Sequence, residues 1–178
     1  LHMHSQYSKI NKPGDKSRVK DMVASEFVDI LNQSGVELFS IADHNYFSDV
    51  YYDEIDKYIT DNDLNMKIIN GVELDAYVEL KDGTKDSIHI CIYFSDNTDR
   101  KKLNKVIYSL YRDNNDNMLE PLFMEIINKL TELNTKFIII PHGDKHKGLF
   151  KIIKNLNSED AVDFYKYSMY KIFNAFDV

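Results

Sequence analysis

The sequence predicts an α/β fold, on the basis of three features. Short apolar runs of the length of buried strands alternate along the chain with longer segments whose apolar residues recur at helical spacing. Of the 178 residues, 43% are hydrophobic and 29% are charged, as in a globular protein with a packed core. This length suits one ordinary domain, so we expect a single domain over residues 1–178. Because neither end carries a polar tail, we also expect the chain to be a fragment of a longer protein.

The first half of the chain predicts strands and helices in alternation. A helix is predicted over residues 24–34, where apolar residues fall on one face, and Gly35 suits the left-handed end of that helix. A short buried strand over 36–42 follows directly. The same pattern then repeats, with a helix over 50–59 and a strand over 66–69.

The middle of the chain predicts a hairpin and two helices. Residues 76–80 and 87–94 read as strands on either side of Asp82-Gly83, a strong two-residue hairpin signal. Between residues 98 and 133, apolar residues recur at the spacing of two amphipathic helices. We expect these helices to cover one face of the sheet.

The last part of the chain begins with its most apolar run. Residues 137–140 predict a buried strand, which Pro141 closes because proline has no backbone N–H to donate to a sheet. His142 follows directly, and a final helix is predicted over 158–173.

Composition limits the possible sites and locations. A formal net charge of −7 argues against a basic surface that holds nucleic acid over many phosphates, although a nuclease that uses bound cations stays open. A single cysteine, Cys91, excludes an internal disulfide and a thiolate cluster, so we expect any metal to use nitrogen and oxygen. Cys91 alternates with His89 and is interpreted as a buried core residue. Without an 18-residue apolar run or a signal-peptide pattern, we expect a cytoplasmic protein that does not contact membranes.

Metal-ligating residue types gather at the predicted strands. Five of the six histidines lie on or just after one, namely His2, His4, His44, His89 and His142. The period of a strand puts His2 and His4 on one face, where both imidazoles can reach one ion. A lone histidine is more often an ordinary hydrogen-bonded residue, so the prediction of a metal site rests on their coincidence.

Two carboxylates extend this set. Asp43 precedes His44 at a strand end, and Glu73 follows Gly71 and an apolar run, where we expect burial rather than a surface position. Imidazoles with carboxylates and no sulfur suit Mn, Zn or Fe, with Mg as a further candidate.

Five short motifs occur in a fixed order: Leu1-His2-Met3-His4-Ser5, Ile41-Ala42-Asp43-His44-Asn45, Gly71-Val72-Glu73, Ile88-His89-Ile90 and Pro141-His142-Gly143. In order and spacing, this set resembles the motifs of the PHP domain, named for polymerase and histidinol phosphatase, from residue 1 to about residue 150. The segment from Pro141 to Gly148 is similar to the subgroup whose PHP domain precedes an ATPase of the AAA or SMC-like kind.

The resemblance implies a distorted (β/α)7 barrel that binds two or three divalent ions at the C-terminal ends of its strands and hydrolyses phosphate esters. It also implies roles for individual residues. His2 and His4 would bind one ion, Glu73 would bridge two, His89 and His142 would complete the second, His44 would serve a third, and Asp43 would be a ligand or a base. Asp43, His44 and Glu73 are thus the expected catalytic residues.

One departure from the family concerns its last ligands. The family closes its site with an Asp-x-His motif near the end of the barrel, and Asp144-x-His146 lies too close to His142 to be that motif. We therefore expect either that the last strands lie beyond Val178, which leaves the barrel incomplete here, or that the domain lacks a ligand.

The expected function is metal-dependent phosphoester hydrolysis, by a nuclease or nucleotide phosphodiesterase acting on DNA, RNA or a nucleotide. Two alternatives stay open, a small-molecule phosphomonoesterase similar to histidinol phosphatase and a catalytically degenerate module that regulates a fused or partner ATPase. The nuclease hypothesis would use Tyr46, Phe47, Tyr51 and Tyr52 for base stacking, which helix packing explains equally well. Substrate phosphate would contact Arg18, Lys145, His146 and Lys147, for which solvent exposure is the alternative.

Overall fold

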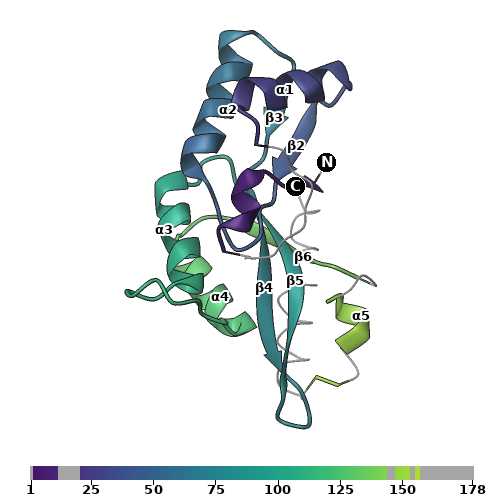
Figure 1. Ribbon diagram of the computed structural model, residues 1–178, viewed down its shortest axis with the longest axis vertical. Coiled ribbons are helices and arrows are strands. Elements are labelled where there is room, and N and C mark those ends of the chain that lie inside the picture. Colours follow the sequence, from purple (N-terminus) through teal and green to yellow (C-terminus); the bar gives the residue numbers. More distant parts are fainter. Residues whose placement is uncertain (1, 12–20, 144–146, 153–154, 157–178) are drawn as a thin grey trace.

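A computed structural model describes residues 2–11, 21–143, 147–152 and 155–156 of the chain (Figure 1). Within these residues the predicted α/β fold is confirmed, with six strands in two three-stranded sheets. One sheet has the order β1-β2-β3 and the other β4-β5-β6. In these segments, no helix combines the length and the apolar character that crossing a membrane requires.

The first sheet is parallel and short. It consists of β1 (His2–Met3), β2 (Leu38–Ile41) and β3 (Lys67–Ile68), which match the predicted strands within a few residues. Two helices connect and cover these strands, α1 (Ala24–Gln33) and α2 (Asp49–Asp61). Both helices confirm the sequence prediction. The apolar face that the residue spacing predicts is the face that each helix buries.

The second sheet is antiparallel, which breaks the predicted alternation of strand and helix. It consists of β4 (Gly71–Glu79), β5 (Lys85–Phe94) and β6 (Phe137–Pro141). β4 begins five residues before the predicted strand, because Glu73 and Asp75 interrupt the apolar residues there although both are buried. Glu73 consequently lies inside a strand rather than after one.

The predicted hairpin joins β4 to β5. The Leu80 amide donates to the Thr84 carbonyl over 2.8 Å, and three residues lie between these two. Gly83 takes the left-handed position of this connection, with φ 81°. The turn is therefore where Asp82-Gly83 predicts it, with one residue more than the two-residue form.

Two further helices, α3 (Arg100–Tyr111) and α4 (Phe123–Thr131), confirm the pair predicted between residues 98 and 133 (Figure 1). Their buried residues join one hydrophobic core with one face of β4 and β5, which carries Val72, Leu74, Ile88, Ile90 and Ile92. Because side chains alternate along a strand, the opposite face of β4 and β5 carries the residues between these. The helices and the polar residues of the sheet are thus separated by the sheet itself.

Two short elements were not predicted. A 3-10 helix, η1 (Gln6–Lys9), follows β1, and α5 (Leu149–Ile152) follows β6. The helix predicted over 158–173 lies outside the described residues. The strands that the structure describes form two sheets and no closed ring, so the (β/α)7 barrel stays a prediction.

Candidate metal centre

The register of the antiparallel sheet brings several polar side chains to one face. Glu73 lies directly opposite Cys91, and Asp75 lies directly opposite His89. The ladder continues past β6, where the His142 amide donates to the His89 carbonyl over 2.9 Å. These residues therefore lie on the face of β4 and β5 that α3 and α4 leave free of the apolar core.

Residues that follow β1 and β2 complete the cluster. Beyond the strand ends, the Ala42 amide still donates to the Met3 carbonyl over 2.7 Å, and His44 forms a parallel bridge with Glu73. The imidazole rings of His4 and His44 stack, with centroids 4.5 Å apart and planes inclined by 16°. The cluster thus lies where the two sheets meet.

The carboxylate of Glu73 lies at the centre of this cluster and is 1% exposed, which agrees with its predicted burial. Its Oε1 is 3.4 Å from His44 Nδ1, and its Oε2 is 3.7 Å from both His4 Nε2 and His142 Nε2. Oxygen and nitrogen ligands of one tetrahedral ion, at bond lengths of about 2.0–2.2 Å, lie about 3.3–3.5 Å apart. These distances fit a divalent cation after small adjustments of the side chains.

Two groups of three residues have ligand atoms that all lie within 4.8 Å of one another. The first is His4, His44 and Glu73, and the second is Glu73, Cys91 and His142. Glu73 belongs to both groups, so its carboxylate is placed to bridge two neighbouring ions. The bridging role that the family resemblance implies for Glu73 stays a prediction.

His89 has a different environment. Its Nδ1 is 2.5 Å from Glu73 Oε1, and its Nε2 is 2.8 Å from Asp75 Oδ1. A separation of 2.5 Å is too short for two ligands of one ion and is that of a close ion pair. In this structure His89 therefore links two buried carboxylates, and its role as a metal ligand stays a prediction.

Asp75 is a site residue that the sequence reasoning missed. Besides His89, its carboxylate contacts Asn45 Nδ2 at 2.9 Å and Lys147 Nζ at 3.1 Å, and its amide donates to Asn45 Oδ1 over 2.7 Å. Asn45 adopts a left-handed backbone, with φ 55°, which asparagine tolerates better than most residues. The spacing Glu73-x-Asp75, equivalent to that of His2-x-His4, is the signal that could have identified Asp75.

Asp43 is buried and is held by a neighbouring serine. The Ser5 amide donates to Asp43 Oδ1 and the Ser5 hydroxyl to Oδ2, each over 2.5 Å. The His44 amide donates in turn to the Ser8 hydroxyl over 3.1 Å, so η1 fixes the loop that carries both residues. Among the described residues, neither group of ligand atoms includes Asp43, and its role as a ligand or base stays a prediction.

The remaining predicted residues divide into two sets. Lys147 lies beside the cluster, with its ammonium group in the ion pair with Asp75. Arg18, Lys145 and His146 lie outside the described residues, and His2 is described by its backbone alone, paired with Ser40 in β2. Contact of these four residues with an ion or a phosphate stays a prediction.

The aromatic residues after His44 belong to the core. Phe47, Tyr51 and Tyr52 are at most 2% exposed, and the rings of Phe47 and Tyr52 stack at 4.6 Å. The Tyr52 hydroxyl donates to the Ile41 carbonyl, and burial raises its pKa. Helix packing is therefore the correct explanation for these three residues, and the prediction that they stack on bases is wrong.

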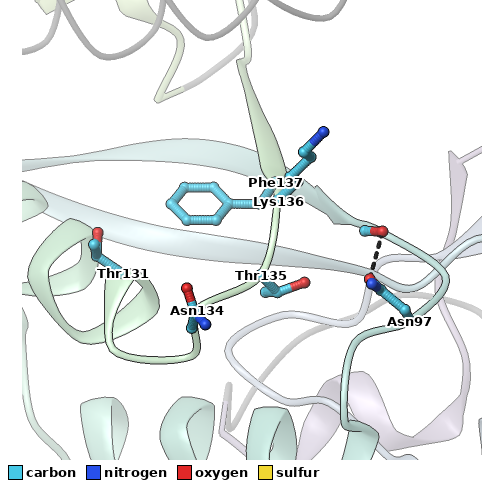
Figure 2. Close-up of a pocket in the computed structure, with 7 residues that line it drawn as sticks. Asn97, Thr131, Asn134, Thr135, Lys136 and Phe137 are labelled. Carbon is cyan, nitrogen blue, oxygen red and sulfur yellow. Dashed lines mark hydrogen bonds between the residues drawn. The ribbon is translucent and has the colours of Figure 1, made fainter.

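A polar hollow of about 490 Å³ lies between the end of α4 and the start of β6 (Figure 2). It is lined by residues that follow β5 and precede β6, among them Asn97, Asn134 and Thr135. In Figure 2 the Ser95 hydroxyl donates to Asn97 Oδ1 over 2.7 Å. Because Phe137 lies at this hollow and His142 follows the other end of β6, the hollow is separate from the histidine cluster.

Comparison with solved structures gives a distant likeness. No protein-family model matches the chain, and no curated protein matches it in sequence. Among solved structures, it is similar to a protein from Bifidobacterium adolescentis provisionally described as a metal-dependent phosphoesterase, with 10% identity and a TM-score of 0.49. The likeness covers 81% of this chain and 68% of the other. At that similarity it carries no conclusion about the function of this chain.

Proposed function

We propose that this chain is a metal-dependent phosphoester hydrolase. The observation that carries the proposal is the buried Glu73 carboxylate, which is shared by two groups of imidazole and sulfur ligand atoms. Paired divalent ions are used by phosphatases, nucleases and aminopeptidases. Among these classes, the ordered motifs that resemble the PHP family favour phosphate esters as the substrate.

Some residues of the cluster would bind the ions, and others hold neighbouring side chains in position. His4, His44 and Glu73 would hold one ion, and His142 with Glu73 would hold a second. Asp75 holds the His89 ring on one side, and Ser5 holds the Asp43 carboxylate close to His44. A divalent cation bound here supplies a water nucleophile near neutral pH and offsets the charge of the phosphate.

The finer proposal concerns the substrate. The burial of Phe47, Tyr51 and Tyr52 leaves only Tyr46, which is half-buried, of the four aromatic residues that an extended polynucleotide would use. A nucleotide phosphodiester and a small phosphomonoester both remain compatible with the cluster. The third alternative, a degenerate module beside an ATPase, would bind metal without turnover.

The experiment begins with protein purified without a chelator. Metal content would be measured by mass spectrometry, and hydrolysis of bis-p-nitrophenyl phosphate and p-nitrophenyl phosphate would be followed with and without added Mn²⁺. We expect bound ions and metal-dependent turnover, and the preferred ester assigns the chain to the diesterase or the monoesterase class. Bound metal without turnover of either ester would favour the degenerate module, and protein that binds no metal would overturn the proposal.

A matched pair of variants locates the activity. Glu73→Gln removes the shared carboxylate charge, and we expect it to lower metal affinity by more than about 100-fold, beyond what loss of a group that only supports a ligand costs. Glu79→Gln makes the same change at the exposed end of the same strand and should leave metal content unchanged. Equal metal content in the two variants would contradict a centre at Glu73.

A further inference from the structure

The second group of ligand atoms contains a sulfur atom that the sequence analysis assigns to the core. Cys91 is 3% exposed, but it does not lie on the apolar face of β5. That face carries Ile90 and Ile92, and Cys91 points to the opposite side, directly across from Glu73. Its cross-strand neighbours on that side are Glu73 on β4 and Ile140 on β6, and the His142 ring also lies there.

The distances around Cys91 match those of a metal site. Its Sγ lies 3.6 Å from His142 Nε2, which is itself 3.7 Å from Glu73 Oε2. With a Zn–S bond of about 2.3 Å and a Zn–N bond of about 2.05 Å, tetrahedral geometry separates the sulfur and nitrogen by about 3.6 Å. The sulfur and the imidazole are thus already spaced as two ligands of one ion.

Two neighbouring residues agree with this assignment. Both ring nitrogens of His89 lie at hydrogen-bond distance from carboxylates, so the position beside His142 that the family resemblance gives to His89 is open to Cys91. The Tyr93 hydroxyl forms a hydrogen bond with the Cys91 side chain. A hydroxyl donor directed at sulfur stabilises a thiolate, which is the form that binds metals.

We propose that Cys91 is a ligand of a divalent cation that it shares with Glu73 and His142. This inference rests on the proposed function and adds the chemical class of the second ion. Thiolate ligands favour Zn and similarly soft ions over Mn and Mg, so this position selects zinc, cobalt or ferrous iron. The expectation that any metal here uses only nitrogen and oxygen is thereby replaced.

The test is the absorption spectrum of the chain loaded with Co²⁺, recorded without thiol reductants. A Co²⁺–thiolate bond gives a charge-transfer band in the near ultraviolet, and nitrogen and oxygen ligands do not. Because Cys91 is the one cysteine of the chain, a band in the unmodified monomeric protein reports this residue without any substitution. We expect the band in the unmodified protein, whether or not a variant folds.

Two variants sharpen the assignment. Cys91→Ser should lose the band, keep Co²⁺ at His4, His44 and Glu73, and bind Zn²⁺ at the second position at least about 10-fold more weakly. Asp86→Asn, at the exposed end of the same strand, leaves the ligand atoms untouched and should keep the band.

The outcomes separate this inference from the proposed function. Bound Co²⁺ without a charge-transfer band in the unmodified protein would overturn ligation by Cys91 and leave the histidine and glutamate centre standing. Failure to bind Co²⁺, Zn²⁺ or Mn²⁺ at all would overturn both.

Discussion

Asp75 acts through several neighbours at once, because its carboxylate contacts His89, Asn45 and Lys147. The contact with His89 is of the kind that orients metal-site histidines, in which a carboxylate fixes which ring nitrogen carries the proton. With Nε2 on Asp75, the Nδ1 atom of His89 is directed at Glu73. Asp75 is thus a positioning residue for the centre of the cluster.

We expect Asp75→Asn to weaken Zn²⁺ binding by about 10- to 100-fold, the range typical of carboxylates that support a metal site. Asp86→Asn on the exposed end of β5 is the control and should bind Zn²⁺ as the unmodified protein does. Zn²⁺ titrations with a competing chelator would measure both affinities. Equal Zn²⁺ affinities of the two variants would show that the Asp75 carboxylate does not position the metal ligands.

At the residue scale, the sequence predicts part of the cluster. His4, His44 and His142 come together because polar residues that follow neighbouring strands meet, and Glu73 joins them from inside β4. Asp75 and Cys91 could not be assigned in this way, because their place depends on the register of β4 against β5. A shift of that register by one residue would reverse the face on which each side chain lies.

At the element scale, β4 passes very close to β2 at Gly71. A Cβ atom built on Gly71 would lie 2.2 Å from the Ser40 hydroxyl oxygen and 3.0 Å from Cδ1 of Tyr93. Glycine therefore allows the two sheets to approach next to Glu73.

We expect Gly71→Ala to lower the free energy of unfolding by about 1–3 kcal/mol, the usual cost of overpacking a core. Ser40→Ala introduced into Gly71→Ala should recover part of this loss, because it removes the nearer of the two obstacles. A double-mutant cycle followed by urea unfolding, with Ser40→Ala alone as the control, measures this coupling. Additive effects of the two substitutions would contradict the close approach.

The hairpin between β4 and β5 depends on a different property of glycine. A Cβ atom built on Gly83 would meet no other atom within 4 Å, but the φ of 81° at this position is costly for other residues. We expect Gly83→Ala to destabilise the protein by about 1–2 kcal/mol, and Gly83→Asn to cost less because asparagine tolerates this conformation. Urea unfolding would measure both, and equal stability of all three proteins would contradict a left-handed turn.

Most elements could be predicted because their apolar faces are regular. The apolar spacing of α1, α2, α3 and α4 matches the face that each helix buries. The start of β4 was missed because Glu73 and Asp75 interrupt the apolar pattern there, and their burial is explained by contacts with distant residues. The antiparallel pairing of β5 with β6 was missed because α3 and α4 lie between them in the sequence, and local patterns carry no information on pairing at that separation.

At the scale of the whole molecule, the candidate centre joins the two sheets. His4 and His44 follow strands of the parallel sheet, whereas Glu73 and Cys91 belong to the antiparallel sheet and His142 follows its last strand. A cation bound by both sets would link segments that are far apart in the sequence. It would also offset the cost of burying the Glu73 carboxylate.

Metal binding should therefore stabilise the whole fold. At a free Zn²⁺ concentration of 100 times Kd, one ion adds about 2.7 kcal/mol to the free energy of unfolding. For a domain of this size, each kcal/mol raises Tm by about 2–4 °C, so we expect a rise of about 5–11 °C relative to protein in excess EDTA. Differential scanning calorimetry would measure both states, with Glu73→Gln as a variant whose Tm should not respond to Zn²⁺. A ligand that binds only the folded state must raise its stability. If the Tm of the unmodified protein is the same in Zn²⁺ and in EDTA, the cation therefore does not bridge the two sheets.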